Sequence, residues 1–563
     1  MKKLFYKKFL YCPIFVLILI LSLSILTVYS CGGGGGGGSV SAPHSYIPKP
    51  PSKQPVVVTP SVTYKLTYNI PASKINAGDT VYLARLNLSN TAYTTPSSEI
   101  TLSANLNYNS ESTTATPENF LPFISTNKSY RVDSPTVFSF NNSKEAFVKT
   151  QSNITSRAAQ QKPFNAAGVA QTGATLDVKV IEYENGKDKV VSRNATLIKE
   201  GKYTNVWFVN GAKDANGNII SDDDIQNICN EIAKKFDQIY TEERNIFGEE
   251  RNNSVYNPTE EPVSTKVNIV LANLNDKYNG SYLGGYFYGI DYFDEPKYSN
   301  YGKFFYIDAA ITKRTPYESY STLVHEFQHM IQFNQKTKCE TWFNEMLSMT
   351  AEDLLASIIF GNTVTDGKSF PQGSVQDSRI YHYLSGYYIS GITDWLSGEY
   401  VLYSYSTAYM FGAYLFRNYG ANYISTLSKS SAVGDMTLIK NTLGANYDAM
   451  LKNYYKALLP PYNRQNTPSF YKDAAFQGYT LPKIKIDEVI YWKIENGQIV
   501  NAGPVGAPKI FEKTDTLPNL RPYGMIIQRI STGGNGGAAT ITVSKSATEN
   551  CYIVVVKSDG TIE

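Results

Sequence analysis

Hydrophobic and polar residues alternate along the chain from residue 61 onward. Apolar side chains take every second position of the first such stretch: Val62, Tyr64, Leu66, Tyr68 and Ile70. A period of two is typical of a strand with one buried face. Further short strands extend as far as 178–180, and Asn185-Gly186 indicates a hairpin turn. We therefore expect an N-terminal β domain, a β-sandwich, over residues 61–202.

Helical spacing replaces this alternation beyond residue 203. An apolar strand at 206–209 precedes a helix whose start is marked by Ser221 and Asp224, which have the spacing of a capping box. The later apolar segments predict two strands and then a helical half: 267–271, 304–307 and 316–420. We expect one domain, 203–460, with a mixed sheet and a helical half.

Alternation returns after Pro460-Pro461. Turns are indicated by Asn496-Gly497 and Asp559-Gly560. This pattern predicts a C-terminal β domain over 461–563. The expected fold class is therefore multidomain α+β.

The N-terminus has the features of a secretion signal. Two Lys pairs precede the uncharged run 13–28, so residues 1–30 are predicted to be a signal peptide. Ser30-Cys31 resembles the lipobox of bacterial lipoproteins, in which the cysteine becomes the lipidated N-terminus. Residues 31–60 are rich in Gly and Pro and predict an extended linker. An uncleaved anchor helix is the alternative, although the apolar run is short for a hydrocarbon core of about 30 Å.

The charge balance argues against nucleic acid as a partner. The chain has 52 Lys and Arg against 49 Asp and Glu. Loss of the signal peptide leaves 48 positive against 49 negative side chains. Recognition of nucleic acid by a strongly basic surface is therefore not indicated.

Cysteine contributes little to the predicted fold. With Cys31 modified, the folded part retains Cys229, Cys339 and Cys551, which allow at most one disulfide. Cys229 falls on the apolar face of a predicted helix, so we expect it to be buried. Cys339 lies between Lys338 and Glu340, so we expect it in a surface turn.

Two of the four histidines lie in one pentad, His325-Glu326-Phe327-Gln328-His329. The uncharged flanks predict a helix, with Pro316 near its start. Residues four apart project from one helix face, so both imidazoles can reach one Zn²⁺ at about 2.0–2.1 Å. Glu326 projects about 100° away, where it is suited to act as general base on a zinc-activated water. Two histidines on a helix without a metal are the alternative.

A catalytic zinc site needs a third protein ligand. The segment 341–348 begins a second helix after a short connection, which makes the two helices antiparallel neighbours. Glu345 lies on this helix, and Glu352 lies seven residues later on nearly the same face. By this spacing, either carboxylate can lie beside the imidazoles.

The combined motif resembles a known family. His-Glu-Phe-Gln-His-Met-Ile, followed by Trp-Phe-Asn-Glu-x-Leu-Ser-x-x-Ala-Glu-Asp, resembles the hyicolysin family of secreted zinc metallopeptidases over roughly residues 205–460. The resemblance implies a zincin-like catalytic domain with Glu345 as third ligand and Glu352 orienting an imidazole through its second ring nitrogen. Met346 departs from the family, which usually has Gly there, and this change could narrow the cleft.

Two further segments have candidate roles. Tyr405-Ser-Thr-Ala-Tyr409 looks like an aminopeptidase helix whose first Tyr hydrogen-bonds the tetrahedral intermediate, so Tyr405 is a candidate oxyanion donor. Core packing of Tyr405 is the alternative. The glycine-aromatic segment 284–289 suits an edge strand that binds extended peptide, or an ordinary hairpin of the sheet. His382 is expected to be structural.

These features predict a zinc metalloendopeptidase, tethered by an N-terminal lipid to a membrane outside the cytoplasm. The expected location is the cell surface or the outer membrane, and the expected substrates are proteins or peptides. One alternative is a non-enzymatic surface adhesin that uses the zincin fold as a scaffold. The other is an exopeptidase, although no Gly-x-Met-Glu-Asn segment for gripping a free amine is present.

Overall fold

The computed structural model describes residues 63–91, 99–108, 130–132, 141 and, with gaps, 171–563. The predicted signal peptide, the lipidation site at Cys31 and the linker 31–60 lie outside the described residues. Among the helices that are described, none is both long and apolar enough to cross a membrane.

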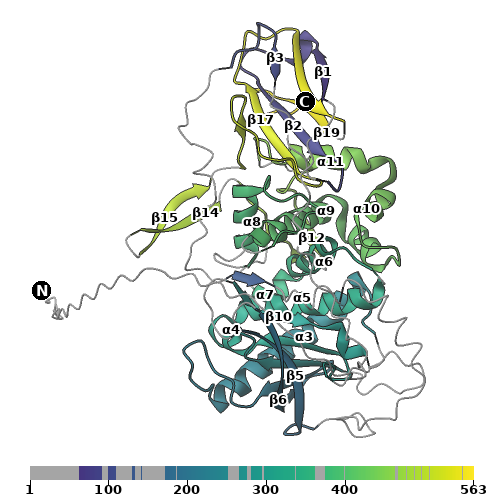
Figure 1. Cartoon of the computed structure of the whole chain (residues 1–563), viewed down its shortest axis with the longest axis vertical. Coiled ribbons are helices and arrows are strands. Elements are labelled where there is room, and N and C mark those ends of the chain that lie inside the picture. Colours follow the sequence, from purple (N-terminus) through teal and green to yellow (C-terminus); the bar gives the residue numbers. More distant parts are fainter. Residues whose placement is uncertain are drawn as a thin grey trace, which may run out of the picture. The chain divides into compact units, whose positions relative to one another are not determined.

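A six-stranded mixed sheet, called the central sheet below, lies in the lower part of the view in Figure 1. Its order is β10-β11-β8-β7-β6-β5. The strands are β5 (Thr175–Glu184), β6 (Lys187–Glu200), β7 (Thr204–Val209), β8 (Val267–Ala272), β10 (Gly285–Phe287) and β11 (Phe304–Asp308). Strands β7, β8 and β11 are parallel and buried at every position, as their continuous apolar runs require. The antiparallel β10 forms one edge.

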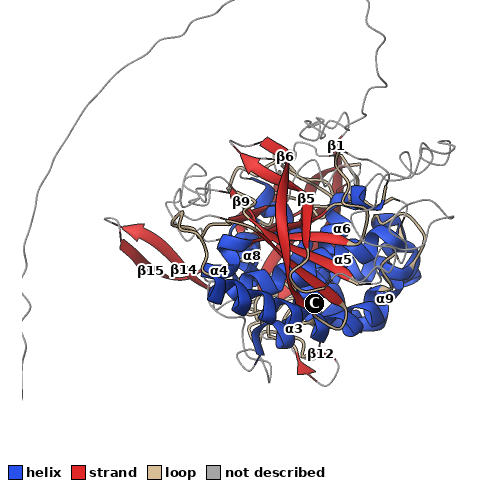
Figure 2. Cartoon of the chain, turned by 90° about the horizontal axis from the view of Figure 1, so that it is seen from below, coloured by secondary structure: helices blue, strands red, loops and turns tan. Residues whose placement is uncertain are grey.

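Helices α3 (Asp222–Phe247) and α5 (Pro316–Gln335) pack on this sheet (Figure 2). The predicted capping box is confirmed, because Ser221 Oγ accepts the Asp224 N–H at 3.3 Å. Phe236 of α3 contacts Phe305 of β11 and Phe327 of α5, with ring centroids 5.9 and 4.9 Å apart. These aromatic contacts fix the helix that carries the histidine pair against the sheet.

The helical half follows α5. Helix α6 (Thr341–Leu354) packs on both α5 and α9 (Val401–Lys429), and α9 also packs on α8 (Val375–Gly386). The shorter helices are α4 (Ala309–Arg314), α7 (Ala356–Phe360), α10 (Met436–Leu443) and α11 (Tyr447–Lys456), with 3₁₀ turns η1 (Ala72–Lys74), η3 (Gly289–Tyr292) and η7 (Gly444–Asn446). The α+β class is therefore confirmed.

The two predicted terminal β domains are corrected by the strand pairing. Strands from both ends of the chain form one two-sheet unit, in which β1-β18-β3 faces β16-β17-β2-β19 (Figure 1). The strands are β1 (Thr63–Ile70), β2 (Thr80–Asn87), β3 (Ile100–Leu102), β16 (Phe511–Glu512), β17 (Met525–Ser531), β18 (Ala539–Ser546) and β19 (Glu549–Val556). Residues 61–202 are therefore not one domain, because β5 and β6 belong to the central sheet.

Long-range pairing is the physical reason for this difference. Alternation reports which face of a strand is buried and gives no information on the partner strand. Strand β2 is buried on both faces: Val81 and Leu83 face the β1-β18-β3 sheet, whereas Tyr82 and Ala84 join the main core. Local sequence does not distinguish these two environments.

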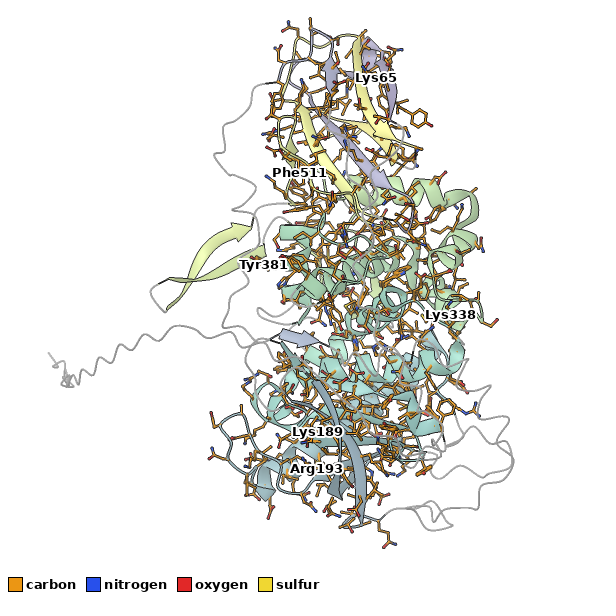
Figure 3. The ribbon with its side chains drawn as sticks, viewed as in Figure 1. Lys65, Lys189, Arg193, Lys338, Tyr381 and Phe511 are labelled. Atoms are coloured by element: carbon orange, nitrogen blue, oxygen red, sulfur yellow. The ribbon has the colours of Figure 1, made fainter. Side chains whose placement is uncertain are left out.

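The two-sheet unit contacts the helical half through specific pairs. The Ile527 N–H of β17 donates to the Tyr387 hydroxyl at 3.2 Å. Phe511 of β16, labelled in Figure 3, packs edge-to-face on Tyr388 at 5.0 Å. Among the described residues, the remaining strands form three two-stranded ribbons: β4 (Tyr130–Val132) with β9 (Ser281–Leu283), β12 (Ala475–Phe476) with β13 (Tyr479–Thr480), and β14 (Val489–Glu495) with β15 (Gln498–Val505).

Candidate metal centre

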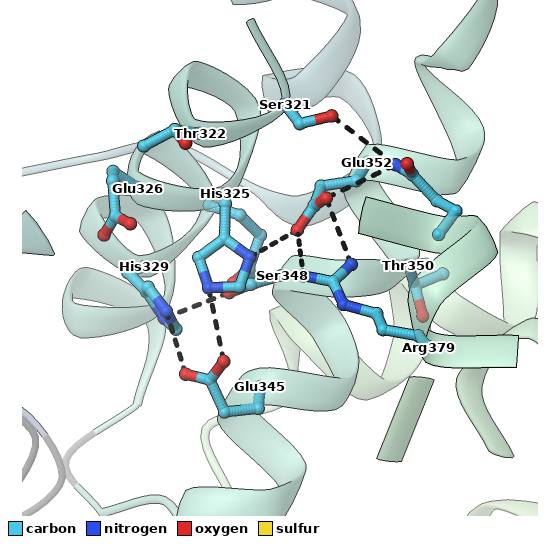
Figure 4. Close-up of polar contacts among 12 residues, drawn as sticks. Ser321, Thr322, His325, Glu326, His329, Glu345, Ser348, Thr350, Glu352 and Arg379 are labelled. Atoms are coloured by element: carbon cyan, nitrogen blue, oxygen red, sulfur yellow. Dashed lines mark hydrogen bonds and ion pairs between the residues drawn. The ribbon is translucent and has the colours of Figure 1, made fainter. Parts of the chain in front are cut away.

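Helices α5 and α6 bring two imidazoles and one carboxylate to a common point (Figure 4). His325 Nε2 lies 3.2 Å from Glu345 Oε2, and His329 Nε2 lies 3.0 Å from Glu345 Oε1. The candidate ligand atoms of the three residues all lie within 4.8 Å of one another. His329 is 7% exposed, His325 1% and Glu345 0%, so His329 is the member of the group nearest to solvent.

The three side chains fit a zinc ion. Ligand atoms about 2.0–2.1 Å from a tetrahedral Zn²⁺ are about 3.3 Å apart, close to the distances between Glu345 and the two imidazoles. Two imidazole nitrogens and a carboxylate oxygen also form a donor set that zinc prefers. The structure therefore places His325, His329 and Glu345 as metal ligands require.

Each imidazole is oriented through its other nitrogen. His325 Nδ1 lies 2.6 Å from Glu352 Oε1. His329 Nδ1 lies 3.0 Å from Ser348 Oγ and 3.2 Å from Asn344 Oδ1. These three partners all come from α6. One helix thus supplies a carboxylate beside the two Nε2 atoms and also fixes both rings from behind.

Glu352 is itself held by α8, a connection that the sequence did not reveal. Arg379 donates to both Glu352 oxygens, from Nη1 to Oε2 at 3.1 Å and from Nη2 to Oε1 at 3.0 Å. Gln376 Nε2 also donates to Oε2 at 3.3 Å. Both residues follow Glu352 by more than 20 positions. No motif or periodicity links them to the histidine pentad.

The charges in the centre stabilise one another. Burial raises the pKa of Glu345. The nearby His329 and His325 imidazoles lower it by more than burial raises it, so the pKa lies well below its ordinary value. Burial lowers the pKa of His329, whereas the charge of Glu345 and a hydrogen bond to it raise the pKa above its ordinary value. The two imidazoles thus favour the charged form of Glu345, whose carboxylate lies where a cation would bind.

Glu326 lies beside the edge strand of the central sheet. Its Oε2 accepts the backbone N–H of Phe287 in β10 at 2.9 Å. The strand runs so close to α5 that a Cβ on Gly285 would meet Thr322 Cγ2 at 2.5 Å. Glycine is therefore needed where the predicted glycine-aromatic segment passes the helix.

Asn141 contacts the same strand. Its Nδ2 donates to Phe287 O at 2.7 Å, and its Oδ1 accepts the Gly289 N–H at 2.8 Å. A carboxamide that donates to one residue and accepts from the residue two further on reproduces the bonds of an added parallel strand. Sequence reasoning did not identify this contact.

Four other predicted residues have definite places. Tyr405 is buried on α9, edge-to-face with Trp395 at 4.8 Å, and its role in catalysis stays a prediction. His382 lies on α8, with Nδ1 2.7 Å from Ser378 O. The prediction for Cys339 was wrong, because the side chain is buried against Gly434 and does not lie in a surface turn. Its charged neighbours did not reveal that the 430–435 segment covers it. Cys229 is buried, as predicted.

Two imidazoles one helical turn apart and a carboxylate from the next helix define a class: metallopeptidases whose metal is held by a His-Glu-x-x-His helix and a downstream glutamate. Within it, the family model for peptidase M30 matches residues 184–502, more than half of the 563 residues. The chain therefore belongs to the peptidase M30 family, and its resemblance to the hyicolysins is confirmed.

The chain is also similar to the neutral metalloprotease ShpI of Staphylococcus hyicus, with 29% identity over 286 residues. That alignment covers 47% of this chain and 56% of the relative. The chain thus spans little more than half the length of the relative it matches.

Proposed function

We propose that this protein is a zinc metalloendopeptidase that hydrolyses internal peptide bonds of proteins or peptides. The observation that carries the proposal is the convergence of His325, His329 and Glu345, with Glu326 beside them on α5. Membership of the peptidase M30 family and similarity to a neutral metalloprotease support the same chemistry.

The proposed ligands of Zn²⁺ are His325, His329 and Glu345. When bound, the ion would act as a Lewis acid and make a water molecule more acidic. Glu326 accepts the proton of the attacking water and returns it to the leaving amine. The hydrogen bond from the Phe287 N–H to Glu326 Oε2 holds this carboxylate in a fixed orientation. Buried surroundings strengthen these electrostatic interactions.

The edge strand and α9 supply the proposed contacts to substrate. The Phe287 carbonyl of β10 and the Gly289 N–H that follows are suited to an extended peptide, which would replace Asn141 there and add to the sheet as another strand. The Tyr405 hydroxyl is the proposed donor to the oxyanion. Tyr405→Phe removes this hydroxyl and should lower kcat more than it changes KM. An unchanged kcat in this variant would leave Tyr405 with only its packing role.

A membrane tether outside the cytoplasm is the proposed setting. The lipobox-like Ser30-Cys31 and the Gly/Pro-rich linker 31–60 support lipid attachment at the cell surface or the outer membrane. Metabolic labelling with a fatty acid should label the wild type and not Cys31→Ala. Equal labelling of both would contradict lipidation at Cys31.

The enzymatic proposal is tested with the purified full-length protein. Casein hydrolysis should be abolished by a chelator and restored by Zn²⁺, and peptides labelled at both ends should be cut internally. Cuts confined to the ends would indicate an exopeptidase. Absence of hydrolysis with a full equivalent of zinc bound would refute the proposal and favour the non-enzymatic adhesin.

A further inference from the structure

We propose that Arg379 is a positioning residue for the metal centre, acting through Glu352 on His325. This inference rests on the proposed metallopeptidase function. Arg379 lies on α8, outside the two helices that carry the candidate ligands (Figure 4). It is 7% exposed and Glu352 is 0% exposed, so their bidentate ion pair is shielded from water.

The guanidinium determines what Glu352 presents to His325. Arg379 and the amide nitrogen of Gln376 are donors, so both oxygens of Glu352 serve as acceptors. Oε1 then accepts from His325 Nδ1 at 2.6 Å. A neutral imidazole carries one proton, and a proton on Nδ1 leaves the lone pair on Nε2. That nitrogen faces Glu345. Arg379 thus favours the tautomer of His325 that can bind a cation.

The arginine fork also fixes the direction of the carboxylate. Two parallel N–H donors hold a carboxylate in one plane, which a single ammonium group does not achieve. The guanidinium in turn lies over the ring of Tyr409 of α9, 5.7 Å from its centroid. Helices α8 and α9 therefore restrain Glu352, and through it the plane of the His325 ring.

The neighbouring ion pair provides a matched control. Asp353 follows Glu352 on α6 and is held by Arg417 of α9, with Nη2 3.1 Å from Oδ1. Both side chains are buried, as in the Arg379 pair. The described contacts of Arg417 include Asp353, Ala413 O and Pro482 O, and do not include His325 or His329.

The test measures Zn²⁺ affinity of the full-length protein by competition with a chromophoric chelator. Arg379→Met should lower the affinity roughly 10- to 100-fold and shift the absorption bands of bound Co²⁺. The Zn²⁺ affinity of Arg379→Lys, which keeps a donor, should lie between that of the wild type and that of Arg379→Met. Arg417→Met should lower the thermal unfolding midpoint and keep the wild-type affinity. Wild-type affinity in Arg379→Met, or equal losses in Arg379→Met and Arg417→Met, would overturn the inference.

A second readout does not depend on metal or on the methionine variant. Proton NMR of the metal-free protein should show a strongly deshielded His325 Nδ1–H, hydrogen-bonded to Glu352 at 2.6 Å, in the wild type and in Arg417→Met. Arg379→Lys, which loosens the Glu352 carboxylate, should shift this resonance upfield, and an unchanged resonance in that variant would overturn the inference. A wild-type protein that binds no zinc would refute the proposed function instead, so the two failures are distinguishable.

Discussion

Arg85 of β2 and Glu549 of β19 form an ion pair, 2.6 Å between Nη1 and Oε1, although 464 positions separate them. Both side chains are fully buried. Arg85 also donates to Gln528 Oε1 of β17 and to Ser544 O of β18. One guanidinium thus connects three strands from the C-terminal end of the chain to one from the N-terminal end.

Breaking this pair should destabilise the two-sheet unit. Arg85→Met leaves the Glu549 charge buried without its partner, which costs about 3–5 kcal/mol. We expect a lower unfolding midpoint and faster proteolysis within β1–β3 and β16–β19. The exposed pair Lys65–Glu99 in the same unit is the control, and Lys65→Met should have little effect. Equal stability of the two variants would contradict the role of the buried pair.

Asp291 should make stability depend on pH. Burial raises its pKa to about 7, against hydrogen bonds from the Asn300 N–H and the Tyr306 hydroxyl, which lower it. The folded protein therefore binds this proton more tightly than the unfolded chain, whose Asp pKa is about 3.9. Asp291 therefore contributes its whole stabilising free energy below about pH 3.9. This contribution falls by about 1.4 kcal/mol per pH unit between that pH and about pH 7.

The measurement is the thermal unfolding midpoint between pH 5 and 7.5. Asp291→Asn cannot ionise, so its midpoint should decline less than that of the wild type over this interval. Parallel curves for the two proteins would show that Asp291 does not carry the predicted dependence.

Asn141 should compete with substrate for the edge strand. Its carboxamide bonds to Phe287 O and to the Gly289 N–H, and these are groups that an added peptide strand would use. Asn141→Ala should lower KM for an extended peptide on the order of five- to tenfold, with kcat unchanged, because one or two net hydrogen bonds no longer need to be broken. Asn194 of β6 is exposed, so the control variant Asn194→Ala should leave KM unaltered. A KM that stays constant or rises in Asn141→Ala would contradict this competition.

The sequence predicted the parts of the molecule that local rules determine. The spacing of His325 and His329 and the proline at the start of α5 follow from the geometry of one helix. The short connection to Glu345 places α6 beside it. These features required no knowledge of distant residues.

Contacts between distant segments were not predictable in this way. Arg379 reaches Glu352 only because α8 packs on α9, and Arg85 meets Glu549 only because the chain ends pair. Alternation had placed those strands in two separate domains. Cys339 looked exposed beside charged neighbours, yet Gly434 covers it.

The most direct test of the central claim is the zinc content of the full-length protein, measured together with peptide hydrolysis on the same preparations. The wild type and Glu326→Gln should each bind one zinc per chain, and only the wild type should hydrolyse peptide, because the amide cannot accept the proton of water. His329→Ala and Glu345→Ala should bind zinc far more weakly. A full equivalent of tightly bound zinc in Glu345→Ala, or undiminished hydrolysis by Glu326→Gln, would contradict the account.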